Sequence, residues 1–361
     1  MAMRVLGSCV QGRALLTCNS SSLTALAVGR VPAASTFATT RLLITASNLF
    51  TASTRSLSIS STMASESVVH QVAAKGFGTG TNELYDRARP SYQPSVLSWI
   101  RKAVRKTDGE KLNVLEIGAG TGIFTRALLA HPDWKDDVGE LMAVEPSEGM
   151  REQFTKTTTS TQTTISVHPG HFASTPAPAA WADLLVIAQA FHWCPDHASA
   201  VKEFARVLKP GAPVVLVWNL EDRDTAPWVA QLRDRIERHE GGTPQFRLGL
   251  WRAFADTKEW RELFRAEPVV GGEPLPSTDL TTLPHTAMHT VGFALQGTEQ
   301  LTLDRACSKS FIALLSEEER QEVINDVRAI LAKGEGMKWV DEAAGVFEYP
   351  YKCTVVVGWK V

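Results

Sequence analysis

The chain has 361 residues, of which 44% are hydrophobic, and a formal net charge of −2. These values are typical of an ordinary globular protein, and the length allows one large domain or two modest ones. No apolar run reaches the roughly 18 residues that a membrane helix requires, so we expect no membrane span. The five cysteines are too scattered for a disulfide framework or a zinc site, and we expect no metal.

The N-terminal segment differs from the rest in charge. Residues 1–65 contain five arginines and no acidic residue, and they are rich in Ser, Thr and Ala. Such a composition is typical of an organelle transit peptide. We therefore expect 1–62 to be a mitochondrial transit peptide or a disordered leader. If translation starts at Met63, the alternative is a cytoplasmic protein.

Strand-like and helix-like segments alternate after the leader. We expect helices at 93–104, 123–131, 147–156 and 197–208, and strands at 112–117, 140–145, 165–169, 183–190 and 212–219. Ser147 is the expected N-cap of the third of these helices. Short apolar strands without polar alternation, separated by helices, indicate a mostly parallel sheet covered on both faces. The predicted fold class is a doubly wound α/β fold.

Beyond Asn219 this alternation stops. We expect a helix at 227–240, a Gly-Gly turn at 241–242, weak strands around 284–295, a helix at 317–333 and a last strand at 351–359. Six of the ten tryptophans follow residue 215. Large apolar side chains suit a cap that builds a pocket over the sheet. We therefore predict a core at 75–225 and a substrate cap at 226–361 that completes the sheet.

The stretch VLEIGAGTG, which ends at Gly122, is the strongest candidate for a ligand site. In open parallel sheets a ligand lies beyond the carboxyl ends of the strands, and glycines let it approach the backbone. The dinucleotide fingerprint G-x-G-x-x-G does not fit, because position 123 is Ile. Glu116, two residues before the first glycine, would repel a pyrophosphate and attract a cation. The ligand of this turn is therefore expected to be cationic.

Glu145 ends the next predicted strand, where a carboxylate can accept hydrogen bonds from ribose hydroxyls. A nucleoside that also carries positive charge is S-adenosylmethionine. VLEIGAGTG, VEPSEGM and ARVLKPGAPVVLVW resemble the motifs of class I S-adenosylmethionine-dependent methyltransferases. The resemblance spans about 75–361 and implies the seven-stranded fold of that family, methyl transfer, and S-adenosylmethionine as cofactor.

Finer features resemble the trans-aconitate and cantharidin methyltransferase branch. The chain has Tyr85, Arg89, Pro90 and Tyr92 early on, and AQAFHW at 188–193. It departs from that branch after the third strand, where Gly-His-Phe-Ala at 170–173 replaces a more usual Gly-x-Ala-Glu. This change puts the shape of the adenine pocket in doubt.

Site roles follow from the motifs and the resemblance. The expected cofactor-binding residues are Tyr85, Glu116, Gly118, Ala119, Gly120, Thr121, Gly122, Glu145, Pro146, Met150, His171, Phe172 and Gln189. The expected catalytic residues are His192, Trp193 and Arg89. His192 could deprotonate a hydroxyl or thiol, or it could orient a carboxylate that needs no base. Arg89 could pair with a carboxylate acceptor.

The sequence thus predicts a methyltransferase that acts on a carboxylate or hydroxyl oxygen of a small molecule. One rival is a C-methyltransferase of mitochondrial quinone synthesis, and another is a cofactor-binding assembly factor without catalysis. The chain is acidic after residue 65 and has no nucleic-acid module, so we expect no nucleic-acid partner. It is expected to be a monomer or a homodimer.

Overall fold

The computed structural model describes residues 82–105, 109–267 and 283–361. The predicted leader at 1–62 lies outside these residues, so the transit peptide remains a prediction. The predicted core at 75–225 also begins ahead of the first described residue. The described residues all belong to one compact unit that extends from Met63 to Val361.

A mixed sheet forms the centre of this unit, and its strand order is β3-β2-β1-β4-β5-β9-β6. The parallel strands are β1 (Leu112–Ile117), β2 (Val138–Val144), β3 (Thr164–His168), β4 (Leu184–Ala188) and β5 (Pro213–Glu221). β9 (Val346–Lys360) runs antiparallel to β5. The chain order reverses between β1 and β4, so the sheet is doubly wound, as the sequence predicts.

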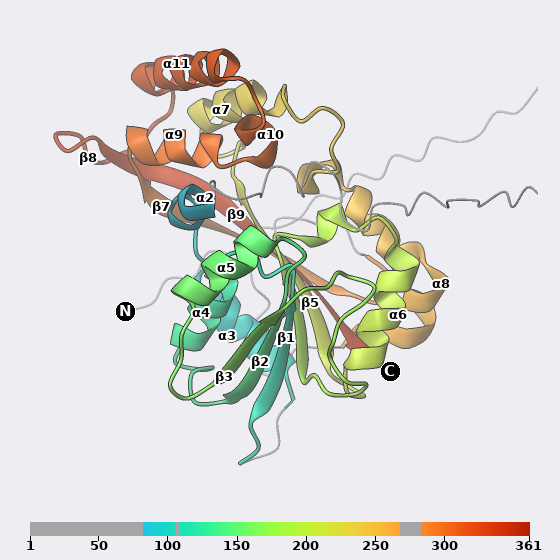
Figure 1. Cartoon of the computed structure of the whole chain (residues 1–361). Helices are drawn as coiled ribbons and strands as arrows, with labels where there is room; N and C mark the ends of the chain where they lie inside the picture. Colours follow the sequence, from blue (N-terminus) through green and yellow to red (C-terminus); the bar gives the residue numbers. More distant parts are fainter. Residues whose placement is uncertain (1–81, 106–108, 268–282) are drawn as a thin grey trace, which may run out of the picture. The chain divides into compact units, whose positions relative to one another are not determined.

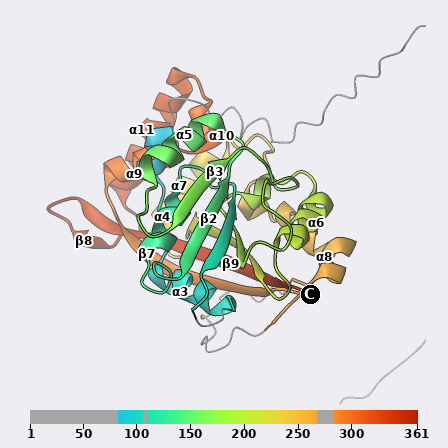
Figure 2. The same cartoon turned by 60° about the horizontal axis from the view of Figure 1, so that its bottom comes forward.

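Helices cover both faces of the sheet (Figures 1 and 2). One face holds α3 (Pro94–Ala103), α4 (Ile123–Ala130) and α5 (Glu148–Thr157), and the other holds α6 (His197–Val207) and α8 (Lys258–Leu263). Neighbouring strand residues supply opposite faces: Val114 and Val186 pack with the α3 side, whereas Leu115 and Leu185 pack with the α6 side. Because both faces are covered, every residue of β4 is apolar and buried.

The C-terminal part adds antiparallel strands and a helical layer. β7 (Ala287–Gly297) pairs with β9 along its whole length, and the short β6 (Phe264–Arg265) and β8 (Trp339–Asp341) also pair with β9. β6 and β8 bring the seven predicted strands to nine among the described residues. Four helices, α7 (Pro227–Glu237), α9 (Glu299–Cys307), α10 (Ser310–Ala313) and α11 (Glu317–Lys333), lie together beyond the end of β5 (Figure 1). A separate apolar core joins α7, α9 and α11 to the first half of β9.

Most predicted elements agree with the structure to within a few residues. β1 and α11 match their predicted bounds, and Ser147 caps α5 by accepting the Met150 N–H. Six short elements are additional to the prediction: α2 (Asn82–Ala88), η1 (Phe191–Trp193), η2 (Phe246–Leu248), η3 (Leu250–Asp256), α8 and α10. α9 was likewise not assigned from sequence. These segments are too short for a clear period, or they are held by tertiary contacts.

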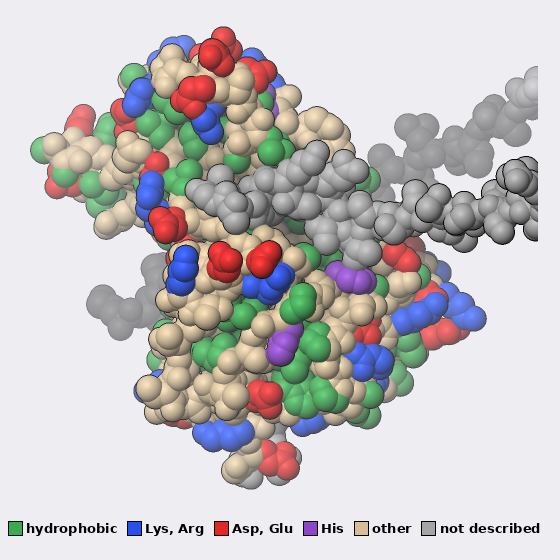
Figure 3. Space-filling model, in the orientation of Figure 1, with side chains coloured by type: hydrophobic (Ala, Val, Ile, Leu, Met, Phe, Trp, Pro, Cys, Tyr) green, Lys and Arg blue, Asp and Glu red, His purple; other side chains and the backbone are tan. Residues whose placement is uncertain are grey.

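Charged side chains are mixed on the surface. On the face drawn in Figure 3, acidic and basic side chains alternate over the upper helices without a field of one sign. Within the part of the chain that the structure describes, the helices are all too short or too polar to cross a bilayer.

One buried carboxylate connects the C-terminal helices to the sheet. Glu221, the last residue of β5, is 2% exposed and accepts from Lys309 Nζ at 2.8 Å and from Arg233 Nη1 at 2.8 Å. Arg305 Nε lies 3.4 Å from the same carboxylate. The three cations come from α7, α9 and the residue that precedes α10, and they hold the pKa of Glu221 well below its usual range despite the opposing effect of burial. Glu221 therefore fixes three helices against one strand end.

Replacing Glu221 with alanine is expected to destabilise the protein by about 3–5 kcal/mol, because three buried cations lose their common partner. Urea unfolding monitored by tryptophan fluorescence measures this change. Asp326→Ala is the matched control, since Asp326 pairs with Arg235 on an exposed face and should contribute about 1 kcal/mol or less. Equal effects of the two substitutions would contradict the role given to Glu221.

Candidate functional site

The turn after β1 is shaped by three glycines. Gly118, Gly120 and Gly122 have φ angles of +73°, +56° and +85°, which side chains with a Cβ rarely adopt. A Cβ on Gly118 would lie 2.5 Å from the Cβ of Ala190, which is closer than two such atoms can approach. Ala190, which follows β4, therefore also requires glycine at position 118. Gly122 serves as the N-cap of α4, where a Cβ would meet Phe154 and Thr158. The turn thus brings backbone close to the ends of β1 and β4.

Glu116 lies at the end of β1 and is 1% exposed. Thr125 of α4 donates its hydroxyl to the carboxylate. Burial raises the pKa of Glu116 to about 8, and the neighbouring Glu145 adds to this rise. A carboxyl with such a pKa is poised to gain from a cationic ligand, because the ligand would favour its ionised form.

Glu145 follows β2 and links the second strand to the glycine turn. Its Oε2 accepts the Gly120 N–H at 3.0 Å, and its Oε1 accepts the Ser147 N–H at 2.9 Å. Burial raises its pKa, although both hydrogen bonds act against the rise. A carboxylate has about four acceptor positions, so each oxygen keeps one for a pair of ligand hydroxyls.

A cavity lies beside these groups at the carboxyl ends of β1 and β4. Its lining includes Glu116 and the glycine turn from Gly118 to Thr121, together with Tyr85, Arg89, Pro90, Tyr92 and Gln189. We call it the cofactor cavity. Because the parallel strands β1, β2 and β4 end at the same edge, three distant sequence motifs converge here.

α2 closes one side of the cofactor cavity and is tied to the glycine turn. Asp86 of α2 accepts from the Thr121 hydroxyl at 2.6 Å and pairs with Arg126 of α4 at 2.6 Å. On the other side of α2, Arg87 pairs with Asp304 of α9 at 3.3 Å. The helix therefore holds Tyr85 between the sheet and the C-terminal helices.

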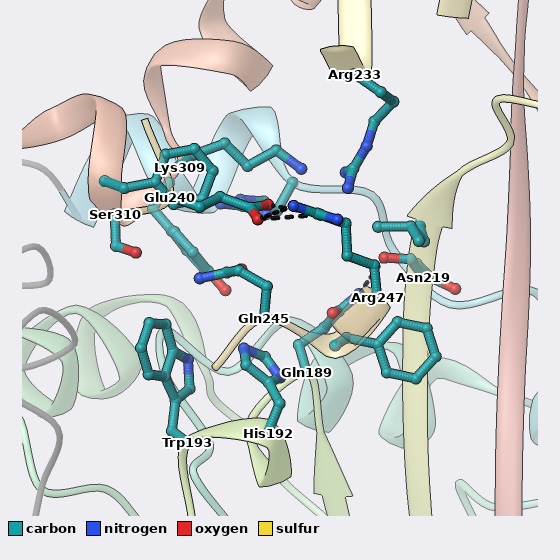
Figure 4. Close-up of a pocket in the computed structure, with 15 residues that line it drawn as sticks. Gln189, His192, Trp193, Asn219, Arg233, Glu240, Gln245, Arg247, Lys309 and Ser310 are labelled. Atoms are coloured by element: carbon teal, nitrogen blue, oxygen red, sulfur yellow. Dashed lines mark hydrogen bonds and ion pairs between the residues drawn. The ribbon is translucent and has the colours of Figure 1, made fainter. Parts of the chain in front are cut away.

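A second cavity adjoins the first, and we call it the acceptor cavity (Figure 4). It opens to solvent, and its wall is built from side chains of several elements. Its lining residues are Tyr85, Arg89, Gln189, His192, Trp193, Asn219, Leu220, Arg233, Glu240, Gln245, Phe246, Arg247, Lys309, Ser310 and Phe311. Tyr85, Arg89 and Gln189 also line the cofactor cavity. The three shared residues mark the boundary between the two cavities.

Arg89 has donor capacity that its neighbours leave unused. Its Nη2 donates to the Ser308 carbonyl at 2.9 Å, and its guanidinium lies 4.9 Å from the centre of the Tyr85 ring. The Nε atom is buried and has no hydrogen-bond partner among the described residues. Desolvation and the nearby Arg305 lower the pKa of Arg89. An unsatisfied buried donor is costly, and an anion in the cavity would remove this cost.

His192 and Trp193 form the short helix η1 and point into the acceptor cavity (Figure 4). The indole Nε1 of Trp218 donates to His192 Nδ1 at 3.2 Å. Burial lowers the pKa of His192 to about 3, and the nearby Arg89 contributes to this. His192 is therefore a neutral ring at physiological pH, and its basicity is weak.

Gln189 has a strained backbone at the boundary of the cavities. Its φ angle is +59°, and its side-chain Nε2 donates to the Asn219 carbonyl at 2.8 Å. A non-glycine residue in this conformation costs about 1 kcal/mol or more, so the surrounding structure must hold it. Asn219, which donates to the Ser91 carbonyl, has a buried side-chain oxygen that no described residue satisfies.

The structure separates the predicted site residues into two groups. The predicted residues that line one cavity or both are Tyr85, Arg89, Glu116, Gly118, Ala119, Gly120, Thr121, Gln189, His192 and Trp193. The lining does not include Gly122, Glu145, Pro146, Met150, His171 or Phe172. Of these, Glu145 acts on the turn through Gly120, and Phe172 packs on Phe191 with ring centres 5.8 Å apart. The cofactor contacts expected of these six residues remain predictions.

Several residues that line the acceptor cavity are not predicted from the sequence. Asn219 follows the rule that ligands meet the carboxyl ends of parallel strands, and its place at the end of a predicted strand was a usable signal. Arg247 and Lys309 belong to segments without a motif, and only the fold brings them to the cavity. Trp218 does not line the cavity, and its role is visible only through its bond to His192.

Comparison with known proteins finds similarity to methyltransferases. Residues 115–216 match the family model of a methyltransferase domain. An uncharacterised methyltransferase-like protein of Schizosaccharomyces pombe is 32% identical over 189 residues, which cover 51% of this chain and 66% of that protein. A second methyltransferase of that yeast, also uncharacterised, is 30% identical, and the match covers 44% of this chain and 58% of the relative. The chain thus spans about three fifths of the length of these relatives.

Bacterial relatives are matched over a longer region. An uncharacterised methyltransferase of Mycobacterium bovis is 27% identical over 252 residues, which cover 69% of this chain and 82% of the relative. Among solved structures, a putative type II methyltransferase from Anaeromyxobacter dehalogenans is 16% identical with a TM-score of 0.45, and the match covers 75% of this chain and 97% of that one.

The cofactor of this domain family is S-adenosylmethionine, and the residues of the cofactor cavity fit it. Glu116 would provide negative charge for an ammonium group, and Glu145, which lies beside the cavity, would have acceptors left for two ribose hydroxyls. The missing Cβ of Gly118 leaves backbone open to close approach. Two buried carboxyls beside the turn suit this cation better than a pyrophosphate.

The pKa of Glu116 predicts how cofactor binding depends on pH. Below pH 8 the free protein holds Glu116 neutral, and binding an ammonium group requires its ionisation. The affinity for S-adenosylhomocysteine, measured by calorimetry, is therefore expected to fall as pH is lowered from 8 to 6, approaching about tenfold per pH unit. Glu116→Gln should bind more weakly and lose this dependence. A wild-type affinity that stays constant across this range would contradict the assignment.

Proposed function

Residues 115–216 match the family model of a methyltransferase domain, and from this premise we propose that the protein is an S-adenosylmethionine-dependent enzyme that methylates a carboxylate oxygen of a small molecule. The observation that carries the proposal is Arg89, which lines both adjoining cavities and whose buried Nε has no hydrogen-bond partner among the described residues. When bound, S-adenosylmethionine supplies an electrophilic methyl group for in-line displacement. The residues of the chain bind and align the partners.

The charge of the acceptor cavity supports an anionic acceptor. Among the residues that the structure describes, five basic side chains lie at or directly behind its wall and face three carboxylates. The basic residues are Arg89, Arg233, Arg247, Arg305 and Lys309, and the acidic ones are Glu221, Glu237 and Glu240. Burying positive charge without compensation is unfavourable. An acceptor that carries negative charge would restore the balance.

The two cavities also differ in the charge of the residues around them. The cofactor cavity contains Glu116 and lies beside Glu145, which suits a cation, whereas the acceptor cavity is rich in cations. This arrangement favours binding a sulfonium on one side and an anion on the other, with Tyr85, Arg89 and Gln189 between them. Alignment of two opposite charges in a site that excludes water supplies much of the rate in such a displacement.

The roles of individual residues follow from their positions. Arg89 would hold the acceptor carboxylate through its free donors, and Gln189 would fix the edge of the boundary through its bond to Asn219. Tyr85 would cover the boundary from α2 and contribute an aromatic face toward positive charge. Trp193 would shield the acceptor from water.

A labelling experiment tests this proposal. The full-length protein is incubated with methyl-labelled S-adenosylmethionine and separate panels of organic acids, alcohols and a polyprenyl phenol. We expect label in an acid, and we expect mild base to release that label as methanol, because methyl esters hydrolyse whereas ethers and C-methyl groups do not. Label that appears only in the phenol would support the quinone alternative. Cofactor binding without any labelled product would support the assembly factor.

Substitution of Arg89 tests the residue that carries the proposal. Arg89→Gln is expected to lower kcat/KM for the acid about 10- to 100-fold, because a charge-assisted hydrogen bond to the acceptor is lost. Arg87→Gln is the matched control, since Arg87 lies on the same helix and is exposed, with its bond to Asp304 at the surface. It should change kcat/KM less than about twofold. Equal losses in both variants would contradict the role of Arg89.

A further inference from the structure

His192 lies in the acceptor cavity, and its ring accepts a hydrogen bond at Nδ1. Trp218 of β5 is fully buried, and its Nε1 donates to His192 Nδ1 at 3.2 Å. An indole N–H can only donate, so the Nδ1 atom must be the acceptor and cannot carry a proton. The remaining proton of the neutral ring is then on Nε2.

The indole of Trp218 is itself fixed by aromatic packing. It stacks on Phe246 with ring centres 4.7 Å apart and packs on Trp251 at 4.5 Å. Trp251 in turn donates to the Phe246 carbonyl at 3.0 Å. Rotating the indole away from His192 would disrupt this group of three rings, so the donor keeps its direction.

The charged side chains around the cavity also disfavour protonation of His192. Of the described residues that line it with His192, four are basic and one is acidic: Arg89, Arg233, Arg247 and Lys309, and Glu240. An imidazolium would add another positive charge, and it would also place an N–H on Nδ1 against the indole donor. The geometry therefore disfavours both the protonated ring and the other neutral tautomer.

We propose that Trp218 is a positioning residue that locks His192 as a hydrogen-bond donor through Nε2, and that this restricts the enzyme to acceptors that are already anionic. The inference rests on the proposed methyl transfer and names a property of its acceptor site. His192 donates to the acceptor oxygen and accepts no proton from it.

The number of protons lost in the transfer step explains the restriction to anionic acceptors. A carboxylate forms its new C–O bond with a lone pair while the C–S bonding pair leaves with sulfur, and no proton has to be removed. An alcohol that reacts in the same way must also lose its hydroxyl proton to a base. The locked ring offers an N–H at the cavity, so His192 cannot take the proton of a neutral alcohol. Glu240, the carboxylate among the described lining residues, is already paired with Arg247.

Nitrogen NMR of the histidine rings tests the lock without any acceptor. In the uniformly nitrogen-labelled full chain, the His192 signals are assigned by their loss in His192→Gln. We expect an unprotonated Nδ1 and a protonated Nε2 from pH 5.5 to 8, with no titration. A ring that titrates near pH 6.5, or that carries its proton on Nδ1, would overturn the proposal.

A pair of tryptophan variants tests the positioning residue. Trp218→Phe keeps an aromatic ring but removes the donor, and it should release His192 to exchange between its two neutral tautomers. Trp251→Phe is the matched control, because Trp251 is equally buried in the same stack and donates to a backbone carbonyl. It should leave the His192 signals unchanged. The same His192 signals in both variants would overturn the proposal.

Kinetic measurements with the acid identified by labelling test whether His192 acts as a hydrogen-bond donor. His192→Gln retains an N–H donor and should keep kcat/KM within about tenfold of wild type, whereas His192→Phe should lose about 100-fold. Equal, large losses in both would indicate a base and overturn the proposal. The NMR result does not depend on methyl transfer, so a failure of the proposed function stays distinguishable from a failure of this inference.

Discussion

The hydrogen bond between Glu145 and the Gly120 N–H is the interaction on which the cofactor side of the site depends. It joins the end of β2 to the turn after β1 and so fixes two motifs that lie 25 residues apart. The parallel pairing of β1 with β2 and β4 brings Glu116, Glu145 and Gln189 to the same edge of the sheet. Without this shared edge, the glycine turn would be an ordinary bend with no ligand groups around it.

A second constraint comes from charge. Buried carboxyls gather at the cofactor cavity and cations gather at the acceptor cavity, and Arg89 lies where the two meet. Glu221 balances three of the cations and at the same time fixes α7, α9 and the start of α10 to the end of β5. The same ion-pair group thus shapes the acceptor wall and connects the C-terminal helices to the sheet. Binding and architecture are coupled in these residues.

Much of the core could be predicted from the sequence, because its signals are local. Apolar strands, the Ser147 cap and the glycine turn each depend on a few neighbouring residues, and β1 and α11 agree with their predicted bounds. The acceptor cavity could not be predicted in this way. Its walls come from α2, η1, the end of β5, η2 and the start of α10, which share no motif and meet only through tertiary packing. α2 is also too short for a period, and the ion pair between its Asp86 and Arg126 of α4 holds it against the glycine turn.

His192 shows that sequence-based prediction is limited in the same way for a single side chain. The motif at 188–193 predicts that His192 belongs to the site, but the position of its ring proton depends on the indole of Trp218, which lies 26 residues away on β5. A crystal structure with S-adenosylhomocysteine bound is the most direct test of the central claim. We predict ribose hydroxyls on Glu145, the amino group near Glu116, and the sulfur facing the boundary of Tyr85, Arg89 and Gln189. A ligand whose sulfur faces away from that boundary, or whose ribose lies away from Glu145, would contradict it.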